Sequence, residues 1–500
     1  MVLLRVKSKA SYRALMPHQD KYVKWGLTVR NPACFMEMRL GKTLASIRLI
    51  QRLEGEPLTQ LPILVVAPVT VLEAWEKELT LEDELFVVAH GLPRQKRMDA
   101  VQWAFEGFEQ RRWILLNYES LRATPELALL PWFMVALDES TAIKNPESQI
   151  SAICCGGHVY RKKDNKRYRI TYPGFPEAHN KTVLSGLPAP ESELDLFQQF
   201  KFLYGSFMGC QDYWHFKQRY FHLNFMTGKW EPRPGQKTAI KNYVHHHAFV
   251  MRRSQAGMGS KKIPETRTVI MSDQQKSIYQ EIEDEFAATV VREDFVDVKE
   301  TDYVIVQRTW LARVAGGCDV EGKFLWDPKI KELMGLLRGE LSTQPVVVWF
   351  RFNAELLAVA DALRQVGIPF QKLLGDGSTR DDRKRELESF RQGRSRVLLV
   401  QIKLGKMGLD MSVSRTAIYY SMGYSCEEIV QSEDRILNVR IKEPLLYVYL
   451  VSSGTVDEDV VWAARTKSTN ARFFMTQFKD SFIRRREAQG GKNTRTSKAA

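Results

Sequence analysis

The feature that most constrains this chain is a regular alternation of short, β-rich apolar runs with stretches of helical pattern. Between residues 35 and 140 the apolar runs are LPILVVAP (61–68), WILLNY (113–118) and WFMVALDES (132–140). Strands that alternate with helices predict a parallel sheet covered by helices. Pro68, Asn117 and Asp138 stand at the ends of these runs, where open α/β sheets bind their ligands.

The alternation stops in the middle of the chain and then resumes. Residues 191–325 lose the strand pattern and predict helices, with aromatic-rich segments such as ELDLFQQFKFLYGSF. The β-rich runs that follow lie at residues 344–352, 395–402, 416–422 and 444–453. The sequence therefore predicts an α/β fold, with two parallel-sheet domains and a helical insert between them.

The length and charge of the chain narrow the class of its partner. A chain of 500 residues is expected to form two or three packed units, each with its own core. Its net charge of +14 and pI near 9.3 favour a polyanion such as nucleic acid. The tail after about residue 484 is basic and poor in apolar residues, so we expect it to be disordered.

The cysteines and the apolar runs indicate the compartment. None of the six cysteines forms a C-x-x-C pair, and Cys154-Cys155 is expected to be buried filler. Basic residues interrupt the N-terminal segment, and no apolar run reaches about 18 residues. We therefore expect a soluble, intracellular protein, in the cytoplasm of a bacterium or of a virus-infected host cell.

A glycine-containing loop at Arg39 to Thr43 predicts a phosphate site. Gly41-Lys42-Thr43 stands where an apolar run turns into a helix, so that backbone N–H groups and the helix N-terminus can hold phosphate oxygens. Lys42 is expected to meet the outer phosphates and Thr43 the magnesium ion. The loop departs from the G-x-x-x-x-G-K-[ST] pattern, because Met36 occupies the first glycine position.

An acidic pair about a hundred residues further on supplies the complementary chemistry. The apolar run MVAL leads directly into Asp138 and Glu139. Asp138 is predicted to hold magnesium with its water shell, and Glu139 to activate the attacking water. A phosphate loop and an Asp-Glu strand end in one α/β domain together predict binding and hydrolysis of ATP or GTP.

The order of these motifs resembles the SWI/SNF-related ATPases of helicase superfamily two, from about residue 13 to 465. The segment LMPHQDKYVKW resembles the family's adenine-reading segment, MRLGKT its motif I, VVAPVTVLEAWEKEL its motif Ia and LDEST its motif II. LSGLPAP is similar to the L-T-G-T-P block, VVVWFRF to motif IV, KLGKMGLDMS to motif V and QSEDRILNVR to motif VI. The resemblance is specific because the spacing is ordered throughout.

The resemblance implies two RecA-like lobes with ATP in the cleft between them. It divides the chain into a first RecA-like lobe at 1–190, a helical insert at 191–325, a second RecA-like lobe at 326–480 and a basic tail at 481–500. Its implied ligands and partner are ATP, Mg²⁺ and DNA, which such motors usually track as a duplex without separating its strands. The chain is expected to act as a monomer.

The resemblance also assigns roles to individual residues. Gln19 takes the adenine-reading position, and Arg39, Leu40, Gly41, Lys42 and Thr43 form the nucleotide loop. The expected catalytic residues are Lys42, Asp138, Glu139, Gln431, Arg435 and Arg440, with Thr43 and Asp138 on the metal. DNA contacts are expected from Thr70 of motif Ia and from Lys403 and Lys406 of motif V.

Three positions depart from the family pattern. Motif II reads Asp-Glu-Ser-Thr, so Thr141 replaces the histidine that is thought to link hydrolysis to DNA engagement. In motif VI, Asn438 occupies the second arginine position and Arg440 lies two residues beyond it. An arginine on the developing phosphate charge contributes a rate factor of roughly a thousand or more. Our hypothesis is that Arg435 and Arg440 together supply that charge.

An insertion at about 156–180 has no counterpart in the family pattern. Its segment GGHVYRKKDNKRYRITYPGF is basic and aromatic, and it predicts a β-hairpin around Asp164-Asn165. Arg161, Lys162, Lys163 and Arg167 are candidates for gripping a DNA backbone, while a solvated hairpin is the alternative.

The tract His245 to His247 is assigned a packing or surface role, because adjacent helical residues point in different directions.

Two other functions remain open at this point. A strand-separating helicase is neither shown nor excluded by the sequence. The other alternative is not a motor but an ATP-gated clamp or scaffold with weak hydrolysis. It is suggested by Met36, Thr141 and Asn438, which stand at three positions where motors are usually strict.

Overall fold

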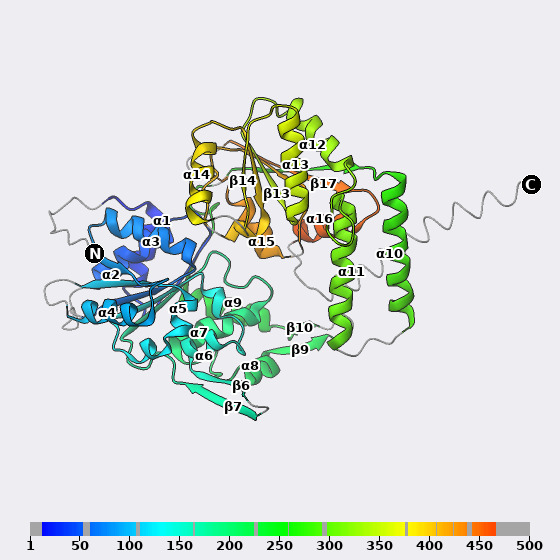
Figure 1. Ribbon diagram of the computed structural model, residues 1–500. Helices are drawn as coiled ribbons and strands as arrows, with labels where there is room; N and C mark the ends of the chain where they lie inside the picture. Colours follow the sequence, from blue (N-terminus) through cyan, green and yellow to red (C-terminus); the bar gives the residue numbers. More distant parts are fainter. Residues whose placement is uncertain are drawn as a thin grey trace, which may run out of the picture. The chain divides into compact units, whose positions relative to one another are not determined.

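The structure is a computed structural model that divides into two compact units, residues 1–258 and 259–500 (Figure 1). It describes residues 13–53, 61–106, 111–163, 166–224, 229–258, 260–292, 298–375, 379–406, 408–423, 425–437 and 443–466. The predicted tail at 481–500 lies outside these ranges. No helix in the described ranges is long and apolar enough to cross a membrane.

The first unit is built on a seven-stranded parallel sheet with the strand order β11-β1-β8-β5-β2-β4-β3. Its strands are β1 (Ala33–Met36), β2 (Ile63–Val66), β3 (Leu85–Val88), β4 (Arg112–Leu116), β5 (Met134–Asp138), β8 (Asn180–Leu184) and β11 (Ala248–Met251). All neighbouring strands are parallel, so their carboxyl ends meet at one edge. This edge carries the segments that follow β1, β2, β5 and β8.

Helices cover both faces of this sheet because successive strand residues point to opposite sides. Ile63 and Val65 pack in one core with α1 (Pro17–Gly26), α2 (Lys42–Arg52) and α3 (Val69–Leu81). Leu64 and Val66 pack in the other core with the remaining helices of the unit. Those helices are α4 (Arg94–Phe105), α5 (Tyr118–Ala123), α6 (Gln149–Cys155), α7 (Leu196–Tyr204), α8 (Tyr213–Tyr220) and α9 (Gln236–His247).

The second unit has a six-stranded parallel sheet with the order β12-β17-β16-β13-β15-β14. Its strands are β12 (Lys262–Val269), β13 (Val346–Phe350), β14 (Phe370–Leu373), β15 (Val397–Gln401), β16 (Thr416–Tyr419) and β17 (Leu445–Ser452). Its helices are α10 (Asp273–Arg292), α11 (Val298–Gly316), α12 (Pro328–Arg338), α13 (Asn353–Gln365), α14 (Arg380–Arg391), α15 (Cys426–Glu433) and α16 (Val456–Thr466). Two apolar cores again lie on opposite faces.

The predicted α/β fold of two parallel sheets flanked by helices is confirmed. Each long apolar run named from the sequence contains a strand of one of the two sheets. The segment 191–325, expected as a single helical insert, contributes α7 to α9 and β11 to the first unit. It contributes β12, α10 and α11 to the second unit. The short edge strand β11 was not predicted, because four residues carry little periodic signal.

The insertion forms an antiparallel hairpin, as predicted, from β6 (Gly157–Lys163) and β7 (Lys166–Tyr172). The turn residues Asp164 and Asn165 lie outside the described ranges. A second small ladder joins β9 (Phe221–Asn224) to β10 (Lys229–Pro232). Neither ladder belongs to the large sheets.

Glu355 of α13 is a fully buried acid in the second unit. Its carboxyl group accepts hydrogen bonds from the Ser421 hydroxyl and, at 3.4 Å, from the Phe352 backbone N–H. A Cβ on Gly316 would lie 1.8 Å from Glu355 Oε1, so the carboxyl group fills space that only glycine leaves. Burial raises the pKa of Glu355 to about 8.

We expect Glu355→Gln to flatten the pH dependence of stability. The pKa of Glu355 is about 8 in the folded chain and 4.5 in its ordinary range. The folded chain therefore holds the extra proton between these values, and its stability falls as pH rises through them. A neutral amide should remove a fall on the order of 5 kcal/mol.

Thermal-unfolding midpoints measured from about pH 5 to about pH 8 test this. Glu321→Gln, at an exposed carboxylate of the same unit, is the matched control and should keep the wild-type slope. If Glu355→Gln also keeps that slope, Glu355 is ionised in the folded protein and the prediction is wrong.

Candidate nucleotide site

The loop between β1 and α2 has the backbone geometry of a phosphate cradle. Arg39 and Gly41 both lie in the left-handed region, with φ of 65° and 71°. The chain then enters α2 at Lys42, so the free N–H groups of the helix N-terminus face the loop. A Cβ on Gly41 would lie 2.2 Å from Gln19 Nε2, which explains the glycine at this position.

Gln19 connects α1 to this loop. Its side chain is buried, and its Nε2 donates to the backbone oxygens of Gly41 at 3.1 Å and Leu40 at 3.4 Å. Its Oε1 accepts from the backbone N–H of Met16 at 2.9 Å. Leu40 is itself buried, and its backbone oxygen also lies 2.9 Å from His18 Nε2. The loop is therefore fastened from one side by α1.

Lys42 extends back across the loop that precedes it. Its Nζ donates to the backbone oxygen of Met36 at 3.1 Å. A Cβ on Gly186, which follows β8, would lie 2.8 Å from Met38 Cγ and 3.4 Å from Lys42 Nζ. The absence of a side chain at Gly186 thus leaves room for the ammonium group inside the loop.

Asp138 is held at the carboxyl end of β5, in the middle of the sheet. It is 2% exposed, and its Oδ2 accepts from Trp75 Nε1 at 2.9 Å. Its Oδ1 accepts from the backbone N–H of Glu139 at 2.8 Å. Burial raises the pKa of Asp138, while the charge of Lys42 and these two donors act in the opposite direction. Lys42 is therefore close enough to Asp138 for its charge to act on the carboxyl group.

Glu139 takes a left-handed conformation with φ of 48°, which turns the chain sharply at the end of the strand. Tyr118 supports this turn, because its hydroxyl donates to the backbone oxygen of Asp138 at 2.9 Å. Ser140, the next residue, donates to Gln199 Oε1 of α7 at 2.7 Å. Tyr118 and Gln199 are both buried, so the turn is fixed from two sides.

The residues present fit a magnesium nucleotide. The left-handed loop turns its backbone into the N-terminus of α2, and Lys42 supplies a cation beside it. Thr43, the second residue of α2, and Asp138 offer the oxygen ligands that Mg²⁺ prefers. Glu139 adds a second carboxylate beside them. Such a set can bind a triphosphate and activate water toward it.

In the second unit, the motif V and motif VI segments pack on each other. A Cβ on Gly405 would lie 3.2 Å from Ser432 Cβ of α15, so this close approach requires glycine. Arg435 Nε donates to the backbone oxygen of Gly405 at 2.7 Å, and the Met411 N–H donates to the backbone oxygen of Arg435 at 3.0 Å. Gln431 is buried, and its Nε2 donates to Glu427 Oε1 at 3.2 Å.

The other predicted residues are scattered or outside the described part of the chain. Thr70 lies in the first turn of α3, after β2, and Lys403 is exposed after β15. Asn438 and Arg440 lie outside the described residues. The backbone of Lys406, Lys162, Lys163 and Arg167 is described, but their side chains are not. Thr141 is partly exposed in the turn after Glu139.

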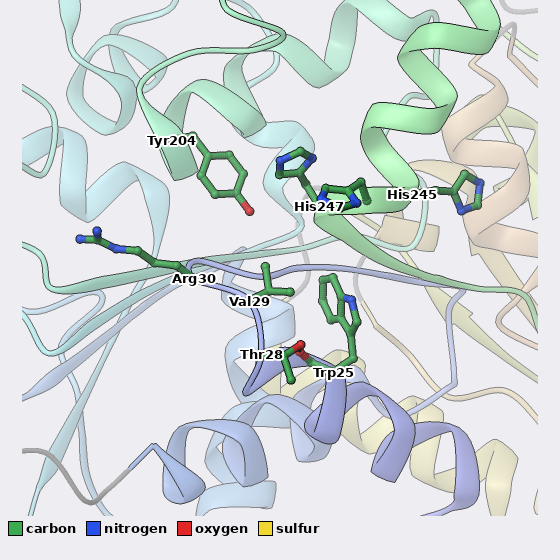
Figure 2. A pocket seen from close by; sticks show the side chains of 8 residues that line it. Trp25, Thr28, Val29, Arg30, Tyr204, His245 and His247 are labelled. Carbon is green, nitrogen blue, oxygen red and sulfur yellow. The ribbon is translucent and has the colours of Figure 1, made fainter.

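The histidine tract lines a surface hollow of about 570 Å³ at the opposite edge of the first sheet (Figure 2). Arg30 precedes β1 and His247 directly precedes β11, so the hollow lies at the amino ends of these strands. His247 stacks on Tyr243 at 4.1 Å between ring centroids, whereas His245 is exposed and points away from Tyr204 in Figure 2. Within the described residues, no group of three potential ligands is placed to hold a metal ion.

Sequence reasoning missed the residues that position the acidic pair. Trp75, Tyr118 and Gln199 contact Asp138 or Ser140 from helices 63, 20 and 59 residues away along the chain. The indole of Trp75 could have been suspected, because a buried Trp on an apolar helix face needs an acceptor for its N–H. Gly186 had a weaker signal, as the glycine of the segment LSGLPAP that is similar to the L-T-G-T-P block.

The comparisons with known proteins cover both units. The profile described as the SNF2-related domain matches residues 18–309, which is more than half of the chain. The profile described as the helicase conserved C-terminal domain matches residues 328–440. The family resemblance drawn from the motifs is therefore confirmed.

Individual relatives are distant but extend over most of the chain. The protein YwqA of Bacillus subtilis, named as an ATP-dependent helicase/translocase, is 23% identical over 91% of this chain and 48% of its own length. The ATP-dependent DNA helicase DDM1 of Arabidopsis thaliana is 21% identical over 91% of this chain and 61% of its own length. The chain thus spans between about half and three fifths of these relatives.

A solved structure supports the architecture alone. The helicase domain of Hef from Pyrococcus furiosus has a TM-score of 0.51 and 14% identity, with 90% of this chain and 98% of that chain covered. Two parallel sheets flanked by helices, as in RecA-like lobes, are therefore common to both.

Proposed function

The chain belongs to the SNF2-related family, and from this premise we propose that it is a DNA-dependent ATPase that translocates on double-stranded DNA. The proposal is carried by one observation: Lys42, Asp138 and Glu139 converge at the carboxyl edge of a parallel sheet, beside a left-handed glycine loop. Nucleotide hydrolysis requires a cation for the phosphates, a metal-holding carboxylate and a second carboxylate for the water. These are the three groups present.

The residues of the first unit divide this work. The backbone of residues 39–41 and the N-terminus of α2 bind the phosphates, and Lys42 neutralises the outer ones. Thr43 and Asp138 would hold Mg²⁺, which supplies charge neutralisation on the transferred phosphoryl group. Glu139 orients the attacking water and accepts its proton. Gln19, which the resemblance gives as the adenine-reading residue, is proposed to support the phosphate loop through its bonds to Leu40 and Gly41.

The second unit is proposed to supply the γ-phosphate cation. Arg435 is the motif VI arginine that the structure describes, and its hydrogen bond to Gly405 ties it to motif V. Motif V also carries Lys403, which we propose as a DNA contact. A displacement of Arg435 on hydrolysis would therefore also move the motif V segment, which we propose contacts DNA through Lys403.

Steady-state ATP turnover with and without duplex DNA tests the proposed function. We expect duplex DNA to raise kcat, and Glu139→Gln, the inactive control, to remove turnover in both conditions. Absence of stimulation by duplex DNA would contradict the motor. Displacement of a third strand from a triplex would show tracking on duplex DNA, whereas release of one strand of the duplex itself would show a strand-separating helicase.

We expect Gly41→Ala to raise KM for ATP roughly tenfold, which corresponds to about 1.4 kcal/mol. The added Cβ would lie 2.2 Å from Gln19 Nε2, so the Gln19 side chain must leave its bonds to the loop. Alanine in the left-handed region adds strain of about 1–2 kcal/mol at the same residue.

Gly91→Ala is the matched control for backbone strain alone. Gly91 has φ of 72°, and a Cβ there would meet nothing within 4 Å. Its KM for ATP should equal the wild-type value. An unchanged KM in Gly41→Ala as well would show that Gln19 does not support nucleotide binding.

A further inference from the structure

The β6–β7 hairpin is the part of the first unit that the proposed ATPase site leaves unused. It connects α6 to the segment that leads into β8, and it pairs with no strand of the seven-stranded sheet. In Figure 1 the two strands run along the outside of the first unit, beyond α6 and α8. The hairpin is therefore an appendage on a complete ATPase fold.

The base of the hairpin is fixed by close backbone packing. Gly156 and Gly174 flank the two strands and both lie in the left-handed region, with φ of 73° and 84°. A Cβ on Gly174 would lie 3.0 Å from the backbone nitrogen of Gly156 and 3.3 Å from the carbonyl carbon of Cys155. Phe175, the next residue, is buried in the core of the unit. The hairpin thus leaves the fold from a rigid base.

One face of the hairpin packs on α6. Val159 and Ile170 form a cross-strand pair on this face, and Val159 is buried. Gln149 of α6 donates through Nε2 to the Tyr172 hydroxyl at 2.8 Å, and its Oε1 accepts from Arg161. These contacts lie on one face, so they orient the hairpin and leave its opposite face to solvent.

The opposite face combines aromatic rings with a cation. Tyr160 and Arg169 form a cross-strand pair, and His158 is the next residue of β6 on the same side. Tyr160 is 50% exposed, and Arg169 and His158 are also exposed. The His158 ring meets Tyr160 edge-on at 5.3 Å, and Arg169 contacts His158 Nδ1 at 3.3 Å. This arrangement displays the ring and the guanidinium together.

The charge of the hairpin has one sign. Residues 157–172 contain six arginines and lysines and a single carboxylate, Asp164. A solvated surface usually intersperses both signs, because like charges repel one another. Arginine and tyrosine on one face also suit the sugar–phosphate backbone.

We propose that the β6–β7 hairpin is a second DNA-binding element, which grips the sugar–phosphate backbone independently of the nucleotide state. It rests on the proposed function, since the DNA it holds is the track of the motor. The grip is independent of base sequence, because its cations meet phosphates.

The affinity for DNA without nucleotide tests the proposal. Arg167→Gln with Arg169→Gln, which removes two cations two residues apart on β7, is expected to weaken binding about tenfold and to lower the slope of log Kd against log salt by roughly one for each cation removed. The probe is a fluorescent duplex of about 30 base pairs, titrated between about 50 and 200 mM salt. A single strand of the same length shows whether the backbone of a duplex is required.

A matched double variant controls for net charge. Lys96→Gln with Arg122→Gln removes two exposed cations from α4 and α5, and it should keep the wild-type affinity and slope. Arg167→Lys with Arg169→Lys should retain most of the slope, because lysine still neutralises phosphates. Replacing all six basic residues of the hairpin should deepen the loss.

Two outcomes separate this proposal from the proposed function. A salt slope unchanged by the hairpin variants, in a protein whose ATP turnover rises with duplex DNA, overturns the hairpin proposal alone. If the salt slope falls in the hairpin variants but duplex DNA does not change the ATP turnover of the wild type, the hairpin proposal is supported and the motor is contradicted. Turnover without DNA should equal wild type in the hairpin variants, which also shows that they are folded.

Discussion

Glu139→Gln is expected to lower DNA-stimulated ATP turnover by about three orders of magnitude while ATP binding persists. Glutamine has nearly the same shape as glutamate but cannot accept the proton of the attacking water. The phosphate loop and Asp138 are left intact, because the bond of the Glu139 N–H to Asp138 Oδ1 belongs to the backbone. Steady-state kcat and the Kd of a fluorescent ATP analogue measure the two effects separately.

The control for this substitution is Glu147→Gln, an exposed glutamate of the same unit. It should turn over ATP at the wild-type rate. Retention of more than about a tenth of wild-type kcat in Glu139→Gln would exclude Glu139 as the general base, since general-base catalysis contributes roughly 10²- to 10⁴-fold. Loss of ATP binding would instead show that the substitution disturbs the left-handed turn at residue 139.

Arg435→Ala is expected to lower kcat about a thousandfold with a small effect on KM. A guanidinium that meets the charge developing on the transferred phosphoryl group stabilises the transition state more than bound ATP. Arg435→Lys should recover little of the rate, because an ammonium group lacks the planar fork that bonds two phosphate oxygens.

The bond from Arg435 Nε to Gly405 O gives Arg435 a structural role as well. The thermal-unfolding midpoint and the KM for ATP therefore accompany the kcat measurement. A fall in kcat that tracks the fall in the midpoint would contradict a direct role for Arg435. Arg440→Ala is the companion variant: wild-type activity would show that Arg440 is a surface cation and that Arg435 acts alone.

The positions of Trp75 and Gln199 explain why motif II holds its shape with Ser140 and Thr141 in it. Ser140 donates to a buried amide on α7, and Asp138 receives the indole N–H of Trp75 on α3. The turn is thus anchored to helices on both faces of the sheet. The departure from the family pattern at these two residues leaves the support of the Asp138 carboxylate intact.

The sequence by itself determined the elements whose signal is local. Apolar runs such as residues 61–68 and 344–352 predicted central strands in each sheet, because β-branched and aromatic residues that pack on two helical layers leave a continuous apolar pattern. The loop at Arg39 to Thr43 and the pair Asp138-Glu139 were also predicted from the sequence, because each motif is a short run of residues at fixed spacing.

Only the tertiary structure decided which distant residues complete the site. The strand order β1-β8-β5-β2 brings Gly186 against Lys42, and the packing of α1 and α3 brings Gln19 and Trp75 to the loop and to Asp138. Such contacts join positions far apart in the chain, and no local pattern encodes them. The segment 191–325 is likewise divided between the two units by tertiary pairing, because β11 pairs with β1 of the first sheet and β12 pairs with β17 of the second. The position of an edge strand depends on the strand with which it pairs, and the local sequence does not specify that partner.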